Sequence, residues 1–220
     1  MSRTALPDRC RLVLIAPVEG EIGDCTAKVK SALSGGDVAS LIIPVGSRDE
    51  ASLQKLGEAL LPLAQEKGVA VMIENDTRIA GRIKADGVHL ETNPADLAEQ
   101  IEHLDGRLMV GAGGIKTRDE ALDLGEAQPD YVFFGRFGYD NKPEAHSRNL
   151  KLTEWWSEMI ALPCIVLGGT DIASALAVAE TGADFVALSA AVFDGANGTP
   201  ADAVAAVNAL LEQSAPRFTE

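Results

Sequence analysis

Eight short apolar runs recur along the 220 residues, and each is followed by a segment in which apolar residues repeat with a helical period. Runs that are apolar on both faces are typical of parallel strands covered by helices. The runs lie at residues 11–16, 38–43, 69–73, 87–90, 108–110, 131–134, 164–167 and 185–188. Such strand–helix units favour one closed (β/α)₈ barrel of the α/β class, spanning residues 1–220 as a single domain, over an open doubly wound sheet.

The segments between these runs carry the expected helices. Residues 51–67 hold leucines at helical spacing, residues 173–181 are rich in alanine, and residues 201–213 indicate a closing amphipathic helix. A G-x-G-x-x-G motif after the first strand is absent, which removes the main support for a dinucleotide-binding fold.

The net charge of −14 limits the expected partners. Nucleic acids and anionic membranes are bound largely through clustered Lys and Arg, so neither is expected. A small phosphorylated substrate stays compatible with this charge, because backbone N–H groups and one or two cations can outweigh distant, screened carboxylates.

The cysteines and the chain start bear on the compartment. Neither a secretory signal nor a membrane-spanning run is recognisable, which predicts a cytoplasmic protein. Cys10, Cys25 and Cys164 show no C-x-x-C spacing. Free thiols, buried or half-buried, are therefore expected rather than a zinc site or a disulfide framework.

The ends of the predicted strands are the informative positions, because the loops that follow the strands of a barrel bind its ligand. After the seventh strand comes Gly168-Gly169-Thr170-Asp171, and Asp171 is expected to cap the next helix at its start. After the eighth strand comes Ser189-Ala190-Ala191. Small residues let backbone N–H groups approach an anion closely, so these two neighbouring turns predict a phosphate site.

Ordered segments of the chain also carry a family resemblance. They are Ile73-Glu74-Asn75-Asp76, Ala85-Asp86-Gly87-Val88-His89-Leu90, Pro129-Asp130-Tyr131-Val132, Leu167-Gly168-Gly169-Thr170 and residues 181–193. With these segments, from about residue 69 to residue 193, the chain resembles the thiamine phosphate synthases and the related thiazole tautomerases. Single G-A-D and G-G elements occur in many phosphate-binding barrels, whereas their order here is moderately specific.

The resemblance implies a transferase that couples hydroxymethylpyrimidine diphosphate with thiazole phosphate, giving thiamine phosphate and diphosphate. In that family Mg²⁺ and a lysine stabilise the charge of the leaving diphosphate. By matching, Asp76 would bind the metal and Lys142 would contact the diphosphate, and His89 is a third catalytic candidate. The other substrate contacts implied are Asn75, Gly168, Gly169, Ser189 and Ala190.

Some segments depart from the family pattern. A typical synthase ends its second strand with Gln-x-Arg-x-Lys, whereas residues 42–47 of this chain lack both cations. Residues 135–142 replace a Thr-rich loop that ends in lysine, and Arg136 is expected as a substitute anion contact. Glu91 stands where the family continues with Gly-Gln and an acidic metal ligand, and Asp96 is the nearest Asp.

Two alternatives follow from these departures. A thiazole tautomerase-like isomerase needs the phosphate pocket and a proton-transfer group, for which the candidates are His89, His146 and Glu91, but it needs no magnesium. A non-catalytic barrel that binds a phosphorylated metabolite or a protein partner would explain the depleted catalytic set. The missing second-strand cations favour the isomerase, while Asp76 and Lys142 favour the synthase.

Several candidates also have purely structural interpretations. Asp76 can cap the following helix, His89 can be a hydrogen-bonded core residue, and His146 can lie in a solvated loop. Trp155 and Trp156 lie in a helical segment without a basic patch. They are expected to pack in the fold or to form the contact of a homo-oligomer.

Overall fold

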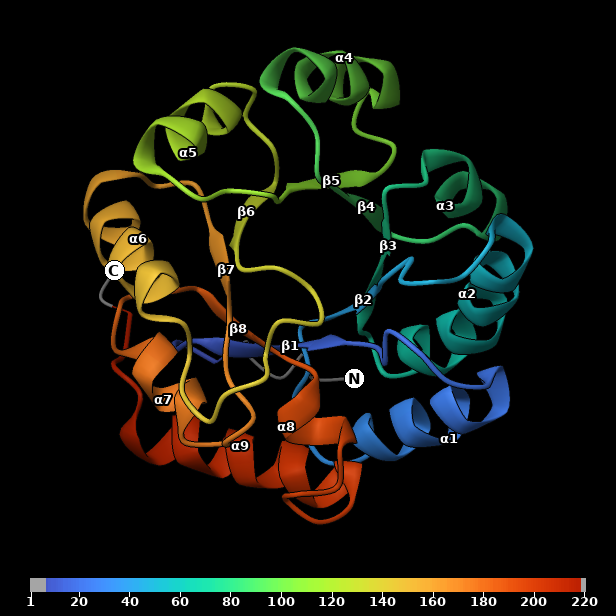
Figure 1. Ribbon diagram of the computed structural model, residues 1–220, viewed down its shortest axis with the longest axis vertical. Coiled ribbons are helices and arrows are strands. Elements are labelled where there is room, and N and C mark those ends of the chain that lie inside the picture. Colours follow the sequence, from blue (N-terminus) through green and yellow to red (C-terminus); the bar gives the residue numbers. More distant parts are fainter. Residues whose placement is uncertain (1–6, 219–220) are drawn as a thin grey trace, which may run out of the picture.

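A computed structural model of the protein describes residues 7–218, which form a closed barrel of parallel strands ringed by helices (Figure 1). Each strand pairs with the next, and β1 closes the ring by pairing with β8. The predicted (β/α)₈ class is therefore confirmed. The strands are β1 (Arg11–Ile15), β2 (Ser40–Ile43), β3 (Ala70–Glu74), β4 (Gly87–Leu90), β5 (Met109–Ala112), β6 (Tyr131–Phe134), β7 (Cys164–Leu167) and β8 (Phe185–Leu188).

Helices follow the strands and cover the outside of the ring. They are α1 (Ile22–Ala32), α2 (Glu50–Gln65), α3 (Thr77–Ile83), α4 (Pro94–Leu104), α5 (Arg118–Gly125), α6 (Ser147–Met159), α7 (Ser174–Ala179), α8 (Ala190–Phe193) and α9 (Pro200–Ser214). Among the helices of residues 7–218, none combines the length and the apolar character that crossing a membrane requires.

The element boundaries agree closely with the prediction, with one correction. The predicted start of the seventh helix at Asp171 is wrong, because α7 begins at Ser174. Asp171 Oδ1 instead accepts the N–H of Ala173 (2.9 Å) and closes a turn ahead of the helix. An Asx turn and a helix cap use the same side chain and the same kind of bond, so the sequence does not distinguish them.

Two apolar cores lie on the two faces of the barrel wall. Outward-pointing side chains of the strands pack beneath the helices, and inward-pointing side chains fill the interior. The inner core includes Val13, Ile42, Met72, Phe133 and Ile165. The barrel is thus packed like a core and is not a channel, so a ligand has to be held by the loops at its rim.

Two groups of side chains with structural predictions are buried as expected. Trp156 is fully buried, and its Nε1 donates to the Leu162 carbonyl (2.8 Å), which confirms a packing role. All three cysteines are free and buried. Burial raises the pKa of Cys164 to about 12, so its thiol stays protonated and unreactive at neutral pH.

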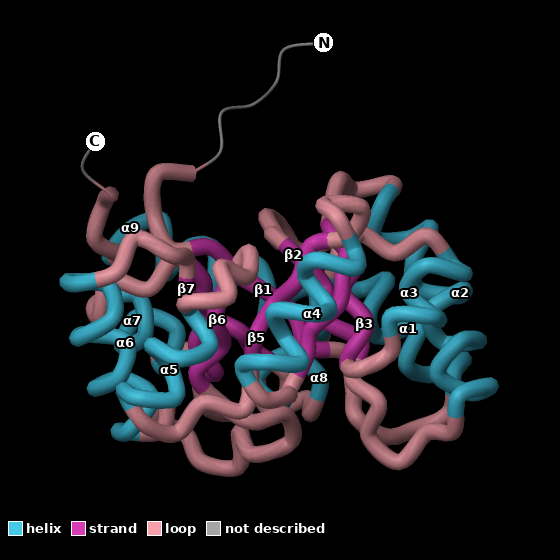
Figure 2. Tube along the Cα trace, turned by 90° about the horizontal axis from the view of Figure 1, so that it is seen from above, coloured by secondary structure: helices cyan, strands magenta, loops and turns pink. Residues whose placement is uncertain are grey.

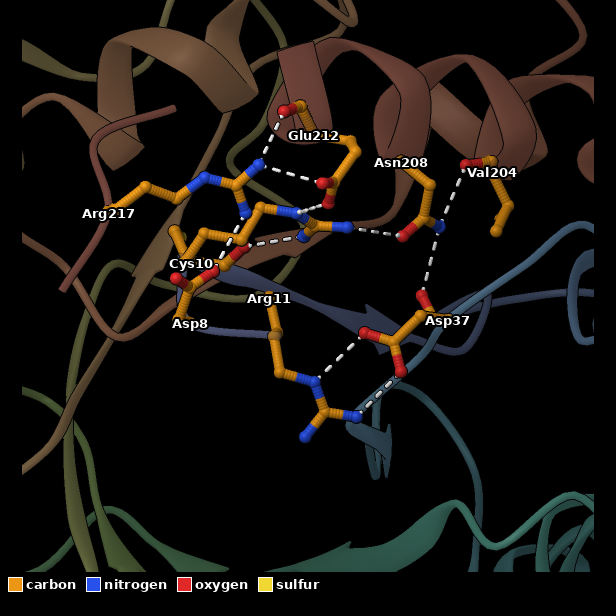
Figure 3. A network of polar contacts seen from close by, with 9 residues as sticks. Asp8, Cys10, Arg11, Asp37, Val204, Asn208, Glu212 and Arg217 are labelled. Atoms are coloured by element: carbon orange, nitrogen blue, oxygen red, sulfur yellow. Dashed lines mark hydrogen bonds and ion pairs between the residues drawn. The ribbon is translucent and has the colours of Figure 1, made fainter. Parts of the chain in front are cut away.

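A polar network at the N-terminal face of the barrel joins β1 to α9 (Figure 3). The guanidinium of Arg9, a residue only 4% exposed, donates to Glu212 Oε2 (2.8 Å) and to the Cys10 carbonyl (2.9 Å). Arg217 also pairs with Glu212 (2.7 Å). Hydrogen bonds from Arg217 and Arg9 lower the pKa of Glu212 to about 2. The network ties the two ends of the described chain together at the face opposite the strand C-termini.

We expect Arg9→Met to lower the free energy of unfolding by about 1–3 kcal/mol, because buried, charge-assisted hydrogen bonds are lost. The matched control Arg82→Met removes an exposed arginine 3.6 Å from Glu50. That change should cost less than about 0.5 kcal/mol. Urea denaturation measures both variants, and an Arg9→Met protein as stable as the wild type would contradict the role assigned to the network.

Candidate active site

The longer loops gather on the face formed by the strand C-termini, at the end of the barrel where α8 lies (Figure 2). A pocket of about 1120 Å³ opens there between the loops after β4, β5 and β6 and the end of β7. The segment after β6, residues 135–146, is called the β6 loop below. It runs inward across the opening of the ring before it returns to α6 (Figure 1).

Three residues of the predicted site, Arg136, Lys142 and Gly168, line this pocket together. Arg136 and Lys142 are exposed, and neither side chain forms an ion pair within residues 7–218. The Arg136 guanidinium carbon lies 4.3 Å from the centre of the Tyr139 ring. Cations that are not neutralised by a carboxylate of the protein can bind the oxygens of an anionic ligand.

The end of β3 is tied to its neighbours through polar side chains. Asn75 adopts a φ of 53°, and its Oδ1 accepts the N–H of Glu91 (2.9 Å). Glu74 Oε2 accepts the N–H of Val45 (2.6 Å). Burial raises the pKa of Glu74, and the charge of Glu91 adds to that effect. Two acidic side chains therefore interact at this part of the rim.

Asp76 has the capping role that its structural interpretation predicts. It is the N-cap of α3, and its Oδ1 accepts the N–H of Ile79 (2.8 Å). The other carboxylate oxygen makes no hydrogen bond within the described residues and can bind a further group. Asp76 lies outside the lining of the pocket that holds Arg136 and Lys142.

His89 lies inside the barrel, beneath the pocket. It is fully buried, with Nδ1 3.1 Å from the Tyr131 hydroxyl, and its Nε2 has no hydrogen-bond partner among residues 7–218. Phe137 of the β6 loop packs against it, with ring centroids 4.9 Å apart. Burial lowers the pKa of His89 to about 3, so the imidazole is neutral at pH 7.

The other candidates for proton transfer, Glu91 and His146, both line the pocket. His146 is the exposed N-cap of α6, and its Nδ1 accepts the N–H of Arg148 (3.2 Å). Its position agrees with the solvated-loop interpretation.

Backbone groups of the β7 loop, where the phosphate is expected, are bonded to the protein itself. The N–H of Thr170 donates to the Lys142 carbonyl (2.7 Å), and the N–H of Gly169 donates to Ser174 Oγ (2.9 Å). A Cβ atom on Gly169 would collide with the carbonyl oxygens of Lys142 and Pro143. In this conformation, the glycine makes room for the β6 loop.

At the β8 loop, the backbone N–H of Ala190 is likewise bonded to the protein itself, through Asp140. No sequence motif marks Asp140. Its side chain is nearly buried, and Oδ2 accepts the N–H of Ala190 (2.7 Å), next to Ser189. Burial raises the pKa of Asp140, and the hydrogen bond from Ala190 opposes that rise. A carboxylate of the β6 loop thus occupies one of the predicted anion contacts.

A family model described as thiamine monophosphate synthase matches residues 12–192. The chain belongs to the thiamine monophosphate synthase family. A thiamine-phosphate synthase of Hyphomonas neptunium is 38% identical over 98% of this chain and 100% of its own length. A thiamine-phosphate synthase of Erythrobacter litoralis is 33% identical over 98% of this chain and 99% of its own length.

Solved structures share the barrel. The thiamine phosphate pyrophosphorylase from Pyrococcus furiosus aligns with a TM-score of 0.77, covering 96% of this chain and 99% of that one at 20% identity. A 3-hexulose-6-phosphate synthase aligns with a TM-score of 0.70, covering 90% and 99% at 17% identity. At these identities the likeness shows a shared fold, and barrels of one fold host many reactions.

The cations that are typical of the thiamine monophosphate synthase family after the second strand have no counterpart at that place. Arg48 follows soon after, but its guanidinium donates to the carbonyls of Val18 (2.6 Å) and Pro17 (2.9 Å) and so holds the β1 loop. On the β6 loop, Arg136 and Lys142 line the pocket, and neither forms an ion pair within residues 7–218.

The side chains at this rim fit a magnesium ion only if the protein supplies few of its ligands. Residues 7–218 contain no group of three or more His, Cys, Asp or Glu side chains placed to hold a metal. Asp96 is bonded to Asn93 Nδ2 (2.7 Å) at the start of α4. Mg²⁺ often takes one or two carboxylates and completes its shell with water and phosphate oxygens. Asp76, with one oxygen outside its capping bond, fits such an ion.

The neutral state of His89 has a measurable consequence for stability. The unfolded chain binds a proton at His89 near pH 6.5, whereas the folded protein does so only near pH 3. Lowering the pH from 7 to 5 therefore favours the unfolded state, by about 2 kcal/mol from this residue. Comparing urea denaturation at the two pH values, we expect the wild type to lose about 2 kcal/mol more than His89→Gln. Equal losses would contradict a buried, neutral His89.

Proposed function

We propose that this protein is a thiamine phosphate synthase, which couples hydroxymethylpyrimidine diphosphate with thiazole phosphate and releases diphosphate. One observation carries the proposal: the chain is 38% identical, over 98% of its length, to a protein named thiamine-phosphate synthase. The position of the pocket supports it, because (β/α)₈ enzymes bind their substrates at the C-terminal ends of the strands.

The β6 loop supplies the cations for the leaving diphosphate. In the reaction the bond between the pyrimidine methylene carbon and the diphosphate oxygen breaks, and the thiazole nitrogen bonds to that carbon. Arg136 and Lys142 line one pocket, form no ion pair with the described part of the chain, and can donate to the oxygens on which negative charge accumulates. They take over the task that cations after the second strand perform in typical family members.

Asp76 is the residue we assign to magnesium, with Asn75 beside it as a contact to the diphosphate. When bound, the metal would neutralise charge on the diphosphate. The backbone of Asn75 is held by its N–H bond to the His89 carbonyl (2.8 Å). Its Oδ1 accepts from Glu91, which leaves the amide NH₂ group to donate to the substrate.

The thiazole phosphate belongs at the β7 and β8 loops. Gly168 lines the pocket there, and the N–H of Ala190 already holds an anion, the Asp140 carboxylate (2.7 Å). Gly169 and Ser189 flank these groups in the chain. Because the β6 loop covers this end, the phosphate can bind here only after the loop has moved.

The alternatives have weaker support. The relatives described above carry the name of a synthase rather than of an isomerase. His89, a candidate base of the isomerase, is covered by Phe137.

We place the reaction in the cytoplasm, where free buried thiols such as those of this chain persist.

The deciding experiment supplies the purified protein with both substrates and Mg²⁺ and follows diphosphate and thiamine phosphate together. We expect both products at equal rates. Lys142→Ala and Asp76→Asn should each lower kcat/KM about tenfold to hundredfold, because each removes a charge-assisted contact of about 1.5–3 kcal/mol.

The matched control is Lys151→Ala, which removes an exposed lysine of α6 outside the main pocket. It should keep kcat/KM within about twofold of the wild type, because an exposed charge at a distance is screened. No thiamine phosphate from the wild-type protein under these conditions would contradict the proposed function.

A further inference from the structure

The β6 loop holds the rim of the barrel through three kinds of contact. The Asp140 carboxylate accepts the N–H of Ala190 (2.7 Å). The carbonyls of Lys142 and Pro143 accept the N–H groups of Thr170 (2.7 Å) and Asp171 (3.2 Å). Further inward, the Phe137 ring lies on His89. The loop therefore covers the phosphate end of the proposed site and packs on the inner core of the barrel at the same time.

The Asp140 carboxylate binds the β8 loop in the way a phosphate group would, by accepting the N–H of Ala190. A carboxylate and a phosphate both present anionic oxygens that accept from backbone N–H groups. The two anions cannot share one donor, and like charges at contact distance repel each other. A phosphate that binds to the N–H of Ala190 must therefore first displace Asp140.

Phe137 places an aromatic ring on His89, where a ring of the substrate would lie. Its ring centroid lies 4.9 Å from that of His89 and 5.1 Å from that of Phe133, in tilted and edge-on arrangements. Beneath it, His89 Nε2 is buried without a hydrogen-bond partner among residues 7–218. A buried polar atom without a partner is costly, whereas a heteroaromatic ring with a polar atom could satisfy it and a phenyl ring cannot.

The geometry points to an intramolecular plug: Asp140 and Phe137 of the β6 loop stand in for the phosphate and the ring of thiazole phosphate, and the substrate binds by displacing them. The identity of the displacing ligand rests on the proposed function. Asp140 is then a residue that sets the affinity for the phosphate, although it contacts no substrate itself.

Two features of the β6 loop favour its displacement from the rim: most of its side chains are exposed, and it contains Gly138. Arg136, Tyr139, Asn141 and Lys142 are exposed, so few side chains other than Asp140 and Phe137 hold the loop inward. Gly138 has a φ of 74°, a conformation that glycine adopts without strain, and it lies between the two plug residues. Displacement would also free Arg136 and Lys142 to follow the diphosphate, because they belong to the same loop.

Calorimetric titration with thiazole phosphate and, separately, with its dephosphorylated alcohol tests the plug directly. Asp140→Ala should bind thiazole phosphate about tenfold to hundredfold more tightly than the wild type, because no carboxylate competes for the N–H of Ala190. Affinity for the alcohol should rise by a smaller factor than that for thiazole phosphate, since the alcohol gains from the loosened loop but brings no anion to that donor. Equal or weaker binding of thiazole phosphate by Asp140→Ala would overturn the plug.

Two variants separate the direct contact from the charge of the region. Asp140→Asn keeps an acceptor of the same shape without the charge, and we expect it to fall between the wild type and Asp140→Ala. It also decides the question if Asp140→Ala fails to fold. Asp194→Asn is the matched control, because the negative charge of this exposed carboxylate acts on Asp140, while its side chain is not the one that accepts the N–H of Ala190. It should leave the affinity within about twofold.

Hydrogen exchange of the wild-type protein tests the movement without any substitution. Saturation with thiazole phosphate should speed exchange at the N–H groups of Thr170 and Asp171, because the displaced loop no longer offers them the carbonyl oxygens of Lys142 and Pro143. Slower exchange there would mean that the loop closes over the ligand and would overturn the plug.

These outcomes separate the plug from the proposed function. A wild type that makes thiamine phosphate, with unchanged affinity in Asp140→Ala, would keep the function and reject the plug. A protein that makes none, yet binds thiazole phosphate more tightly in Asp140→Ala, would reject the function and keep the plug. Absence of binding in every variant would reject the plug whatever the turnover.

Discussion

The closure of eight parallel strands into a ring is the constraint on which everything else in this structure depends. It brings every strand C-terminus to one rim, so that residues far apart in sequence become neighbours there. Asp140 and Ala190 are 50 residues apart and share a hydrogen bond. Since the interior of the ring is packed with apolar side chains, the chemistry of the protein is confined to the loops.

The same closure leaves backbone N–H groups at the rim that need hydrogen-bond acceptors, and the β6 loop supplies them. Backbone N–H groups at the ends of β7 and β8 point to the rim, and such groups are costly when they are buried without acceptors. Asp140 and the carbonyls of Lys142 and Pro143 satisfy them. These backbone N–H groups therefore have acceptors without any ligand. In the plug that we propose, Asp140 is the competitor that a phosphate would displace, and the affinity for the phosphate would depend on the β6 loop as well as on the N–H of Ala190.

The fold could be predicted from the sequence, and the site only in part. Parallel strands leave a period and a length in the sequence, and Tyr131–Phe134 was placed to the residue. Short-range chemistry was ambiguous, as at Asp171, where a turn and a helix cap look alike. Arg136, Lys142 and Gly168 were predicted and do meet in one pocket. Asp140 and Phe137 escaped, because their partners are set by the three-dimensional path of a loop that has no periodic pattern.

In the plug that we propose, the rim of the barrel holds its own substitute for the substrate. A crystal structure of the protein with thiazole phosphate bound tests this most directly. We predict that the phosphate accepts the N–H of Ala190, that Asp140 has withdrawn from this donor, and that a ring replaces Phe137 over His89. A phosphate bound elsewhere, with the 2.7 Å hydrogen bond between Ala190 and Asp140 intact, would contradict the account.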